Sequence, residues 1–557
     1  MKVFGLHLHG HNTGACLIDS GKIVCMTEAR LTRKKHDECF PERSIRYCLE
    51  AFNTNFEEID IIVIDTFNLG NNHSAVTRED HEKRMNLTYL NNLGLGWIDE
   101  NKLRECPSHH LAHAASAFFA TGFDDAAILV VDGGGYGLGD HYLFHNILER
   151  QTMYRGVYDH IYEIRSTSTP ENMPALGHMY ELATKFLGFG VFNDGKTMGL
   201  ASYGAGEMFK DVKLLKSFSG GVDIISNMKL KGPYHYNEFI DKFNLNPNVS
   251  ALPKKEYNEF AFRVQCEFEE GMLHLAKYLQ IVTKSRNLCI AGGCGLNCLA
   301  NSAIKSLKMF DSVFIQPAAT DKGIALGHAL YGWNDIAKQP RLFKNRFDPY
   351  LGKYYSDKEI KDCIDRNYRG LTLVQDRLDE TIRLVVNLLI EKKVIGWFQG
   401  CGEVGPRALG NRSILADPRF NEVKDEINKK IKHREWWRPF APVVLVEYAN
   451  DWFDLDGDDS PYMLLAPLVK EDKRALVPAI THIDNTSRVQ TVSRDFNPVL
   501  YELIAEFFKK TGVPMILNTS LNKGGDPIVE TPQDAINCLM NSEMDYLAIG
   551  NYLIRRK

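Results

Sequence analysis

The run Ala126–Gly135, which reads AAILVVDGGG, decides the fold of the first half of the chain. A continuous apolar run that enters several glycines is typical of a strand buried on both faces and followed by a tight turn. The first 28 residues show a similar order, with β-type runs around the turn Ser20-Gly21. These runs are Val3–His9, Ala15–Asp19 and Lys22–Glu28. The repetition predicts a duplicated α/β unit.

Other periodic stretches extend this pattern along the chain. Helices are predicted over Ser44–Phe52, His110–Thr121 and Phe260–Thr283, and a short strand over Leu288–Ala291. The pattern breaks in residues 336–356, which are rich in Pro, Lys, Arg and Tyr and indicate a linker. A second domain is predicted beyond it, with helices near 357–366 and 378–392 and a strand over Val394–Gln399.

The composition excludes several classes of protein. The 557 residues include 66 Lys or Arg and 71 Asp or Glu, and 44% are hydrophobic. These are the proportions of an ordinary globular chain, not of a disordered or fibrous one. Because no overall positive field exists, we expect neither nucleic acid nor a membrane surface as a partner. Any anion site must come from a local cluster.

Cysteine usage and the N-terminus favour a cytoplasmic location. The twelve cysteines are scattered without paired Cys-x-x-Cys arrangements, which is typical of reduced thiols. Residues 1–7 lack the apolar core of a signal peptide, and no apolar run approaches the length that spans a bilayer.

A candidate metal site begins with His109 and His113, which share one face of a helix because they are four residues apart. The alternative is a partly solvated histidine cluster at a helix start. Asp132 ends a predicted strand, and Asp321 lies in a turn. Each of these two carboxylates either binds the metal together with the histidines or only initiates a turn of the backbone. Two His and two carboxylates suit a divalent transition metal better than soft copper.

Three glycine segments, Gly133–Gly135, Asp194–Gly199 and Gly292–Gly295, adjoin short apolar stretches. Each alone indicates a tight turn, but three in one α/β region predict a nucleotide cleft, although none is a Walker A motif. The residues expected to contact the nucleotide are Gly133, Gly134, Gly135, Lys196, Gly292, Gly293 and Asn297.

The densest chemistry lies between Arg407 and Arg438, where nine Lys or Arg accompany five Asp or Glu. Arg407 follows a Gly-Pro turn and Arg438 precedes Pro439, so a rigid backbone can aim both guanidinium groups at a small phosphate or carboxylate. Two alternatives remain open. Residues 424–432 can be the solvated face of a helix, and the cations beside Trp436 and Trp437 can stack nucleic-acid bases.

Several longer motifs resemble those of the O-carbamoyltransferase family, which includes the nodulation-factor, cephamycin and tobramycin carbamoyltransferases. Residues 28–37 (EARLTRKKHD) are similar to the family segment EERFTRKKHD, and residues 11–15 (HNTGA) fall where the family has His-Asp. The other matching motifs are GKTMGLASYG (195–204), GPRALGNRSILADPR (405–419), REWWRPFAPVV (434–444) and NTSLN (518–522). The resemblance covers nearly the whole chain.

The resemblance implies a fold and an activity. Residues 1–350 would form an actin/hexokinase-like ATPase fold, similar to the tRNA threonylcarbamoyl transfer protein, and residues 351–557 a YrdC-like α/β domain. The second domain would make carbamoyladenylate from ATP and carbamoyl phosphate. The first would transfer the carbamoyl group to a hydroxyl of a small-molecule acceptor of natural-product or sugar type. Magnesium would bind together with ATP. Whether the chain forms a homodimer stays an open question.

The resemblance also implies residue roles. The family metal, usually iron, would be held by His109, His113, Asp132 and Asp321. Carbamoyl phosphate would be bound by Arg407, Lys432, Arg438, Arg488 and Ser520. His11 is the candidate base for the acceptor hydroxyl; the alternative is a structural loop histidine. Two residues depart from the family pattern, since Asn12 replaces an Asp and Ala29 a Glu.

Two other functions are alternatives to carbamoyl transfer. A tRNA threonylcarbamoylating enzyme would need a broad basic surface, which the acidic total disfavours. A nucleotide-regulated, actin-like binding module would leave the cations between Arg407 and Arg438 unexplained. Residues 68–100 and 205–255 carry the least pattern and are expected to border the acceptor site.

Overall fold

The structure is a computed structural model that describes residues 1–65, 87–135, 147–170, 173–218, 223–226, 237–248 and 254–557. The chain forms two compact units. Unit 1 comprises Met1–Glu28 and His36–Phe347, and unit 2 comprises Ala29–Lys35 and Asp348–Lys557. Seven residues from the N-terminal region therefore belong to the second unit, although they lie more than 300 positions away in the sequence.

Unit 1 contains two five-stranded sheets with the same topology. The first has the order β3-β2-β1-β4-β5 and the second the order β8-β7-β6-β11-β12. In each sheet, the first three strands along the chain pair with one another in antiparallel order. Two further strands then pair in parallel on the other side of the first strand. The strands are β1 (Lys2–His7), β2 (Gly14–Asp19), β3 (Lys22–Thr27), β4 (Ile61–Asp65), β5 (Leu103–Cys106), β6 (Asp125–Gly135), β7 (Ile147–Val157), β8 (His160–Pro170), β11 (Asn287–Ala291) and β12 (Ser312–Ile315). The predicted duplication and the actin/hexokinase-like class are confirmed.

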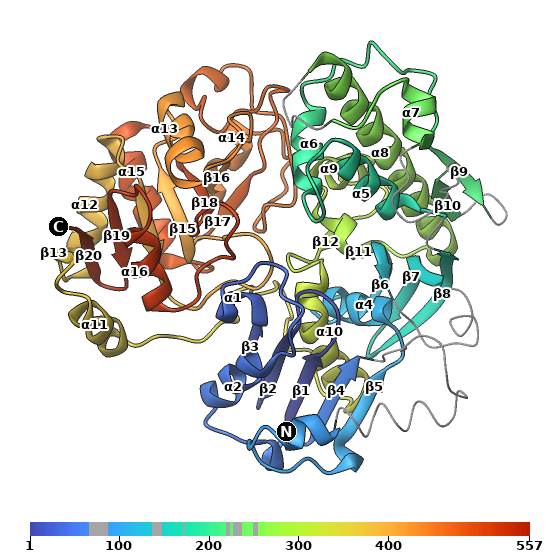
Figure 1. The fold of residues 1–557 in the computed structure, drawn as a ribbon, viewed down its shortest axis with the longest axis horizontal. Coiled ribbons are helices and arrows are strands. Elements are labelled where there is room, and N and C mark those ends of the chain that lie inside the picture. The colour runs from blue at the N-terminus through green and yellow to red at the C-terminus, as the bar shows by residue number, and fades with distance from the viewer. Residues whose placement is uncertain (66–86, 136–146, 171–172, 219–222, 227–236, 249–253) are drawn as a thin grey trace. The chain divides into compact units, whose positions relative to one another are not determined.

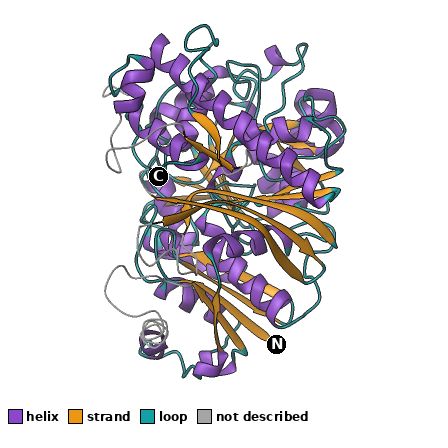
Figure 2. Ribbon diagram, turned by 90° about the vertical axis from the view of Figure 1, so that its right-hand side faces the viewer, coloured by secondary structure: helices purple, strands orange, loops and turns teal. Residues whose placement is uncertain are grey.

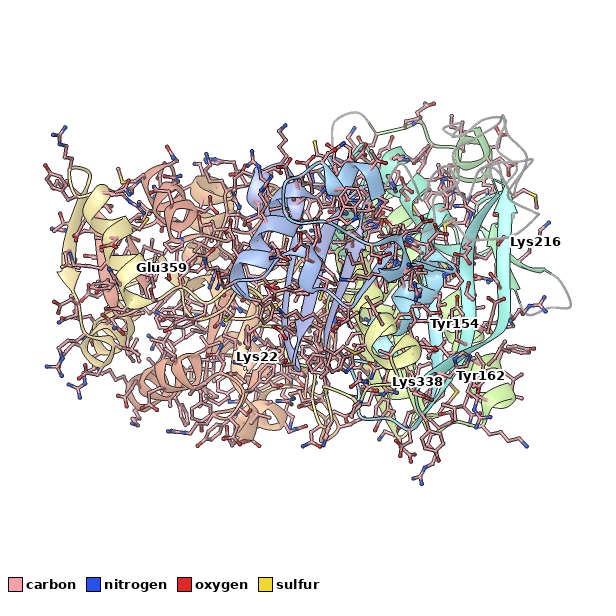
Figure 3. All side chains as sticks on the ribbon, turned by 90° about the horizontal axis from the view of Figure 1, so that it is seen from below. Lys22, Tyr154, Tyr162, Lys216, Lys338 and Glu359 are labelled. Atoms are coloured by element: carbon pink, nitrogen blue, oxygen red, sulfur yellow. The ribbon has the colours of Figure 1, made fainter. Side chains whose placement is uncertain are left out.

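Burial follows the apolar pattern of the strands. All residues of β6 from Ala126 to Val131 are fully buried, as expected for a central strand between helices. The antiparallel edge differs, because Tyr154 of β7 is buried whereas Tyr162 of β8 is exposed (Figure 3).

Two short helices, α4 (His109–Phe118) and α10 (Ile324–Leu330), lie between the two sheets of unit 1 (Figure 1). Helix α10 packs on β1, and α4 packs on β6 and on α10. The helices approach so closely that a Cβ atom on Gly327 would lie 2.0 Å from the carbonyl oxygen of Ala112, so only glycine fits there. This contact joins the two sheets and brings the carboxyl ends of their parallel strands into one region.

Further helices of unit 1 pack on the sheets or on one another. They include α2 (Glu42–Ala51), α5 (Leu176–Phe186), α6 (Asp194–Ala201), α8 (Lys255–Thr283) and α9 (Cys298–Ser306). The predicted helices over 44–52, 110–121 and 260–283 are confirmed by α2, α4 and α8. Within the described residues, no helix is both long enough and apolar enough for a bilayer crossing.

Unit 2 is built on one eight-stranded mixed sheet of order β13-β20-β19-β14-β15-β18-β16-β17. Its strands are β13 (Leu371–Gln375), β14 (Ile395–Phe398), β15 (Arg412–Ala416), β16 (Ala441–Leu445), β17 (Gln490–Val492), β18 (Met515–Ser520), β19 (Tyr546–Ile549) and β20 (Tyr552–Arg556). Its main helices are α11 (Asp357–Arg366), α12 (Leu378–Ile390), α13 (Asn421–Glu426), α15 (Pro498–Thr511) and α16 (Pro532–Met540). The helices and the strand predicted at its start are confirmed. Figure 2 shows helices beside the strands of unit 1.

Candidate functional site

Four side chains of unit 1 converge at the carboxyl ends of its strands. His109 and His113 lie on one face of α4, whose first turn is capped by Ser108. Asp132 lies near the end of β6, and Asp321 lies in the short turn between β12 and α10. One ligand atom from each residue lies within 4.8 Å of the other three. We call His109, His113, Asp132 and Asp321 the four-donor cluster.

The spacing of the four-donor cluster fits a single metal ion. The two Nε2 atoms are 3.1 Å apart, and each lies 3.4–3.6 Å from one oxygen of both Asp132 and Asp321. Neighbouring ligands bound at about 2.1 Å from one ion are themselves roughly 3.0–3.5 Å apart. Two imidazoles and two carboxylates therefore offer a donor set that suits a divalent transition metal.

Backbone amides fix the orientation of Asp132. Its Oδ1 atom accepts hydrogen bonds from the amides of Gly133 (2.8 Å) and Gly293 (3.0 Å), which leaves Oδ2 directed at the histidines. A Cβ atom on Gly293 would lie 2.8 Å from Oδ1, so a side chain would displace the carboxylate. Two of the predicted nucleotide-site glycines thus also position a carboxylate of the four-donor cluster.

Charges within the cluster are strongly coupled. Burial alone would lower the pKa of His109, but Asp321 and Asp132 outweigh it and raise this pKa well above its usual value. Burial opposes ionisation of the two carboxylates, yet the histidines hold the pKa of both Asp132 and Asp321 well below the usual range. Two buried carboxylates thus require positive charge beside them, from protons or from a cation.

His11 lies beside this cluster, in the loop between β1 and β2. Its Nε2 atom is 3.3 Å from Oδ2 of Asp321, and its Nδ1 atom is 2.6 Å from the side-chain amide nitrogen of Asn12. About one third of the side chain is exposed. The loop holds the ring next to the four-donor cluster while leaving it accessible, as a base for an external hydroxyl requires.

Sequence reasoning missed a buried histidine–aspartate network beneath His11. Nδ1 of His7 lies 2.9 Å from Asp65, and Nε2 of His328 lies 3.5 Å from the same carboxylate. Despite burial, the two histidines hold the pKa of Asp65 well below its usual range, while burial lowers the pKa of His328 to about 4. Nε2 of His7 contacts the backbone oxygen of His11 at 3.3 Å. Asp65 is the last residue of β4, and Asp132 lies near the end of β6. An acidic residue at the end of a buried strand was therefore the sequence pattern that could have indicated Asp65.

The other predicted nucleotide-site residues have mixed surroundings. Gly292 and Gly293 follow β11, and Gly133, Gly134 and Gly135 end β6. Of these five residues, Gly133 and Gly293 bond Asp132 of the four-donor cluster. The side chain of Asn297 is engaged elsewhere, since it caps α9 and pairs with Gln265. Lys196 lies on α6, with its ammonium 5.6 Å from the ring centre of Phe189. Their contacts with nucleotide stay predictions.

Much of 68–100 and 205–255, the two segments expected to border the acceptor site, lies outside the described residues.

A second cluster of charge lies in unit 2. Burial and the electrostatic influence of Arg438 and Arg488 lower the pKa of Arg434, and Arg488 also acts on Arg438. Burial, followed by Arg434 and Arg438, lowers the pKa of Lys432 to about 7. We call Lys432, Arg434, Arg438 and Arg488 the cationic cluster. Arg434 was not predicted as a site residue, although it stands in the quoted REWWRPFAPVV motif.

Lys432 is fixed by the NTSLN loop. Its ammonium donates to the backbone oxygen of Ser520 and to two oxygens of Asn522, at 3.0 and 2.6 Å. The hydroxyl of Ser520 lies 3.3 Å away. The structure therefore brings Lys432 and Ser520 together, and much of the hydrogen-bonding capacity of the ammonium serves to hold this loop. The sequence alternative of a solvated helix face is wrong for Lys432, which is buried, whereas Lys429 and Lys430 are exposed.

An acidic residue, Glu435, lies beside the cations. Glu435 lies 3.8 Å from a guanidinium nitrogen of Arg438. Arg434 donates to the side chain of Asn428 and packs over the ring of Phe440. Lys432 and Arg434 are thus held by neutral oxygens and an aromatic face. A group of four buried cations suits a small polyanion.

The loop that carries Arg407 is shaped by a buried carboxylate. Oε1 of Glu403 accepts hydrogen bonds from the backbone amides of Leu409, Asn411 and Arg412, at 2.7–3.1 Å. The segment Ala29–Lys35 supports the same loop, since Arg30 donates to the carbonyl of Gly405 (3.0 Å) and lies 3.5 Å from Glu530. Arg407 thus follows directly on a backbone that three buried charges hold in place.

Comparisons with known proteins identify the family of the chain. The sequence profile described as Carbamoyltransferase N-terminus matches residues 2–92 and 71–330, and the profile described as Carbamoyltransferase C-terminus matches 386–556. Nodulation protein NolNO of Sinorhizobium fredii is 33% identical over 98% of this chain and 79% of its own length. Nodulation protein NolO of Bradyrhizobium diazoefficiens is 35% identical over 81% of this chain and 79% of its own.

Among solved structures, HypF of T. kodakarensis is 14% identical, with a TM-score of 0.35, over 59% of this chain and 48% of its own. The profile matches extend over most of both units, and the two nodulation proteins exceed 30% identity over most of their own length. The chain therefore belongs to the carbamoyltransferase family.

Proposed function

We propose that this carbamoyltransferase uses ATP and carbamoyl phosphate to modify a hydroxyl of a small-molecule acceptor. The observation that carries the proposal is the pair of buried clusters with opposite charge requirements. The four-donor cluster can hold a cation in place of the histidine protons, and the cationic cluster suits an anion of several oxygens. Carbamoyl phosphate is such an anion.

Unit 2 is proposed to form the activated carbamoyl group. The atoms balance in two steps. Water first cleaves carbamoyl phosphate into carbamate and phosphate. The carbamate oxygen then attacks the α-phosphorus of ATP, a new P–O bond forms, and pyrophosphate leaves with Mg²⁺. Arg407, Arg438 and Arg488 would bind the phosphate oxygens, while Lys432 holds the loop that carries Ser520.

Unit 1 is proposed to transfer the carbamoyl group from carbamoyladenylate to the acceptor. His11 would take the proton of the acceptor hydroxyl as its oxygen attacks the carbamoyl carbon, and AMP would leave. The glycines at the ends of β6 and β11 would let the nucleotide phosphate approach the backbone closely. A divalent metal in the four-donor cluster, iron according to the resemblance, would stabilise negative charge on the phosphate oxygens when bound.

The first test is carbamoyl-phosphate-dependent release of pyrophosphate from ATP by the purified chain, supplied in turn with iron, zinc and manganese. We expect release in the presence of carbamoyl phosphate and none with acetyl phosphate. Absence of release under every metal supply would refute the adenylate-forming step. The acceptor is then sought as a carbamoyl mass gain in a panel of hydroxylated metabolites.

A further inference from the structure

A buried serine next to the cationic cluster has an unused hydroxyl. Ser520, whose hydroxyl lies 3.3 Å from the ammonium of Lys432, pairs across the sheet with Ser413 of β15. Residues directly opposite on antiparallel strands point to the same face, with Cβ atoms about 5 Å apart. Ser413 is fully buried, and its hydroxyl has no hydrogen-bond partner among the described residues. This hydroxyl is therefore a neighbour of Ser520 that is available to a ligand.

Asn518 has an unpartnered acceptor on the same face of the sheet. It lies two residues before Ser520 on β18 and is 1% exposed. Its amide nitrogen donates to the carbonyl of Ala408 (3.3 Å) and to Oε1 of Gln490 (2.8 Å). Because Nε2 of Gln490 donates to the carbonyl of Leu409 at 2.7 Å, these bonds define the orientation of both amides. Within the described ranges of the chain, Oδ1 of Asn518 has no hydrogen-bond partner.

The two partners of Asn518 belong to segments that carry predicted phosphate-binding arginines. Ala408 directly follows Arg407, and Gln490 lies two residues after Arg488. The hydrogen bonds of one side chain therefore connect both segments to β18. They keep the unpartnered oxygen of Asn518 close to the segments that are expected to bind the phosphate.

The two unpartnered groups match the carbamoyl end of carbamoyl phosphate. An amide oxygen only accepts hydrogen bonds, whereas a hydroxyl can also donate them. The carbamoyl group has an amino group that donates and a carbonyl oxygen that accepts. Ser413 and Asn518 are diagonal neighbours, since Asn518 pairs with Leu415 of β15. Cβ atoms in this relation are about 7–8 Å apart, a span that one carbamoyl group bridges with a hydrogen bond at each end.

We infer that Asn518 and Ser413 select the carbamoyl group of the substrate. Oδ1 of Asn518 accepts a hydrogen bond from the amino group, and the hydroxyl of Ser413 donates to the carbonyl oxygen. This inference rests on the proposed function, because it takes carbamoyl phosphate as the ligand of the cationic cluster. Acetyl phosphate has a methyl group in place of the amino group, so it leaves the buried oxygen of Asn518 unpartnered. A site built around such a hydrogen bond discriminates strongly against the analogue that lacks the donor.

Two stable analogues test the amino group separately from the phosphate. Phosphonoacetamide carries an amide and acetonylphosphonate a methyl ketone on the same phosphonomethyl group, and neither contains the labile phosphate ester. Their binding to the full chain is measured by calorimetry, with inorganic phosphate as the probe that has no carbamoyl end. We expect the wild type to bind phosphonoacetamide at least about tenfold more tightly than acetonylphosphonate.

The variant Ser413→Ala removes only the unpartnered hydroxyl. It should weaken phosphonoacetamide binding by about three- to tenfold and change phosphate affinity by less than about twofold. Its Tm should be no lower than that of the wild type, because no hydrogen bond within the described residues is lost. The matched control is Ser542→Ala, since Ser542 is also buried in unit 2 but donates to the carbonyl of Cys538 at 2.6 Å. We expect that control to lower Tm and to bind all three probes as the wild type does.

The variant Asn518→Leu removes the acceptor and should bind the two phosphonates with equal affinity. Because this change also breaks two hydrogen bonds, the wild-type preference and Ser413→Ala test the inference independently of its folding. The inference is overturned if the wild type does not prefer phosphonoacetamide, if Ser413→Ala binds it as tightly as the wild type, or if folded Asn518→Leu keeps the preference. Absence of carbamoyl-phosphate-dependent pyrophosphate release in the wild type would instead refute the proposed function, whatever the phosphonates show.

Discussion

The four-donor cluster and the cationic cluster are both buried groups of charged side chains, yet they are balanced in different ways. In the four-donor cluster, two carboxylates face two imidazoles at 3.4–3.6 Å, and each group stabilises the charge on its partners. In the cationic cluster, four cations accompany the carboxylate of Glu435, and burial lowers the pKa of Lys432, Arg434 and Arg438.

This difference indicates the sign of the ligand at each place. Histidines can exchange their protons for a metal ion, so the four-donor cluster is stable both as ion pairs and as a cation site. Arginines have no such exchange, because they stay charged at all physiological pH values. Apart from loss of the Lys432 proton, the cationic cluster is therefore stabilised by an added anion. Four experiments test this contrast.

The largest expected effect is on metal binding. We expect His113→Ala to lower the metal affinity of the chain by at least about 100-fold, since it removes one of four donors. The measurement is metal content after dialysis, by plasma mass spectrometry. His110→Asn is the matched control, because His110 is buried on the same helix but bonds Thr152 at 2.7 Å. Full metal content in His113→Ala would exclude the four-donor cluster as the site.

The next effect concerns the anion. Arg438→Ala should lower carbamoyl-phosphate-dependent pyrophosphate release by about 100-fold, because a buried guanidinium that binds a phosphate oxygen is lost. Metal content should be unchanged. Lys430→Ala, an exposed cation paired with Glu426, should have little effect. If both variants release pyrophosphate at the rate of the wild type, Arg438 does not bind carbamoyl phosphate.

A third effect is pH-dependent. The pKa of Lys432 is lowered to about 7, first by burial and then by Arg434 and Arg438. A bound dianion favours the ammonium and raises this pKa, so binding takes up a proton above pH 7. Affinity should be greatest below pH 7 and fall by up to about tenfold per pH unit above it.

Sulfate is a suitable probe for this effect, because it does not titrate in the range. Calorimetry at pH 8, in buffers that differ in ionisation enthalpy, measures the number of protons taken up when sulfate binds. We expect proton uptake in the wild type and none in Lys432→Met. Sulfate binding without proton uptake in the wild type would contradict the lowered pKa.

The smallest effect concerns the residue beside His11. Asn12→Asp restores the acidic residue of the family pattern, and Asp tolerates the φ of 62° found there. A carboxylate that accepts from Nδ1 makes the imidazole a better base, so we expect the transfer rate to rise a few-fold, about 1 kcal/mol. Pyrophosphate release should stay constant. A transfer rate that falls would show that the neutral amide at Asn12 suits this enzyme.

Much of the fold and part of the site could be predicted from the sequence. The buried strand at 126–132 and the hairpin near the N-terminus were enough to predict the duplicated unit. Continuous and alternating apolar runs indicate directly which faces of a strand are buried. The i, i+4 spacing placed His109 and His113 on one face. Asp132 and Asp321 were recognisable as acidic residues at a strand end and in a turn, but spacing in the sequence did not show that they meet.

Other residues of the site had no pattern that could reveal them. The His7–Asp65–His328 network joins positions up to 321 residues apart. The stacking of His36 on Phe192 depends on loop conformations with positive φ, which are rare for a phenylalanine. Arg434 stood in a recognised motif, but its burial beside Arg438 and Arg488 follows only from the packing of unit 2.

The sequence by itself determined the elements, their periodic faces, the family and the chemical types of the ligand-binding groups, since these depend on neighbours along the chain. Only the tertiary structure decided which groups come together. The packing of α4 on α10 through Gly327 brings histidines and carboxylates from three parts of the chain within 4.8 Å. Burial then fixes their charges, because in a low-dielectric interior each charge must be balanced by a partner or by a ligand.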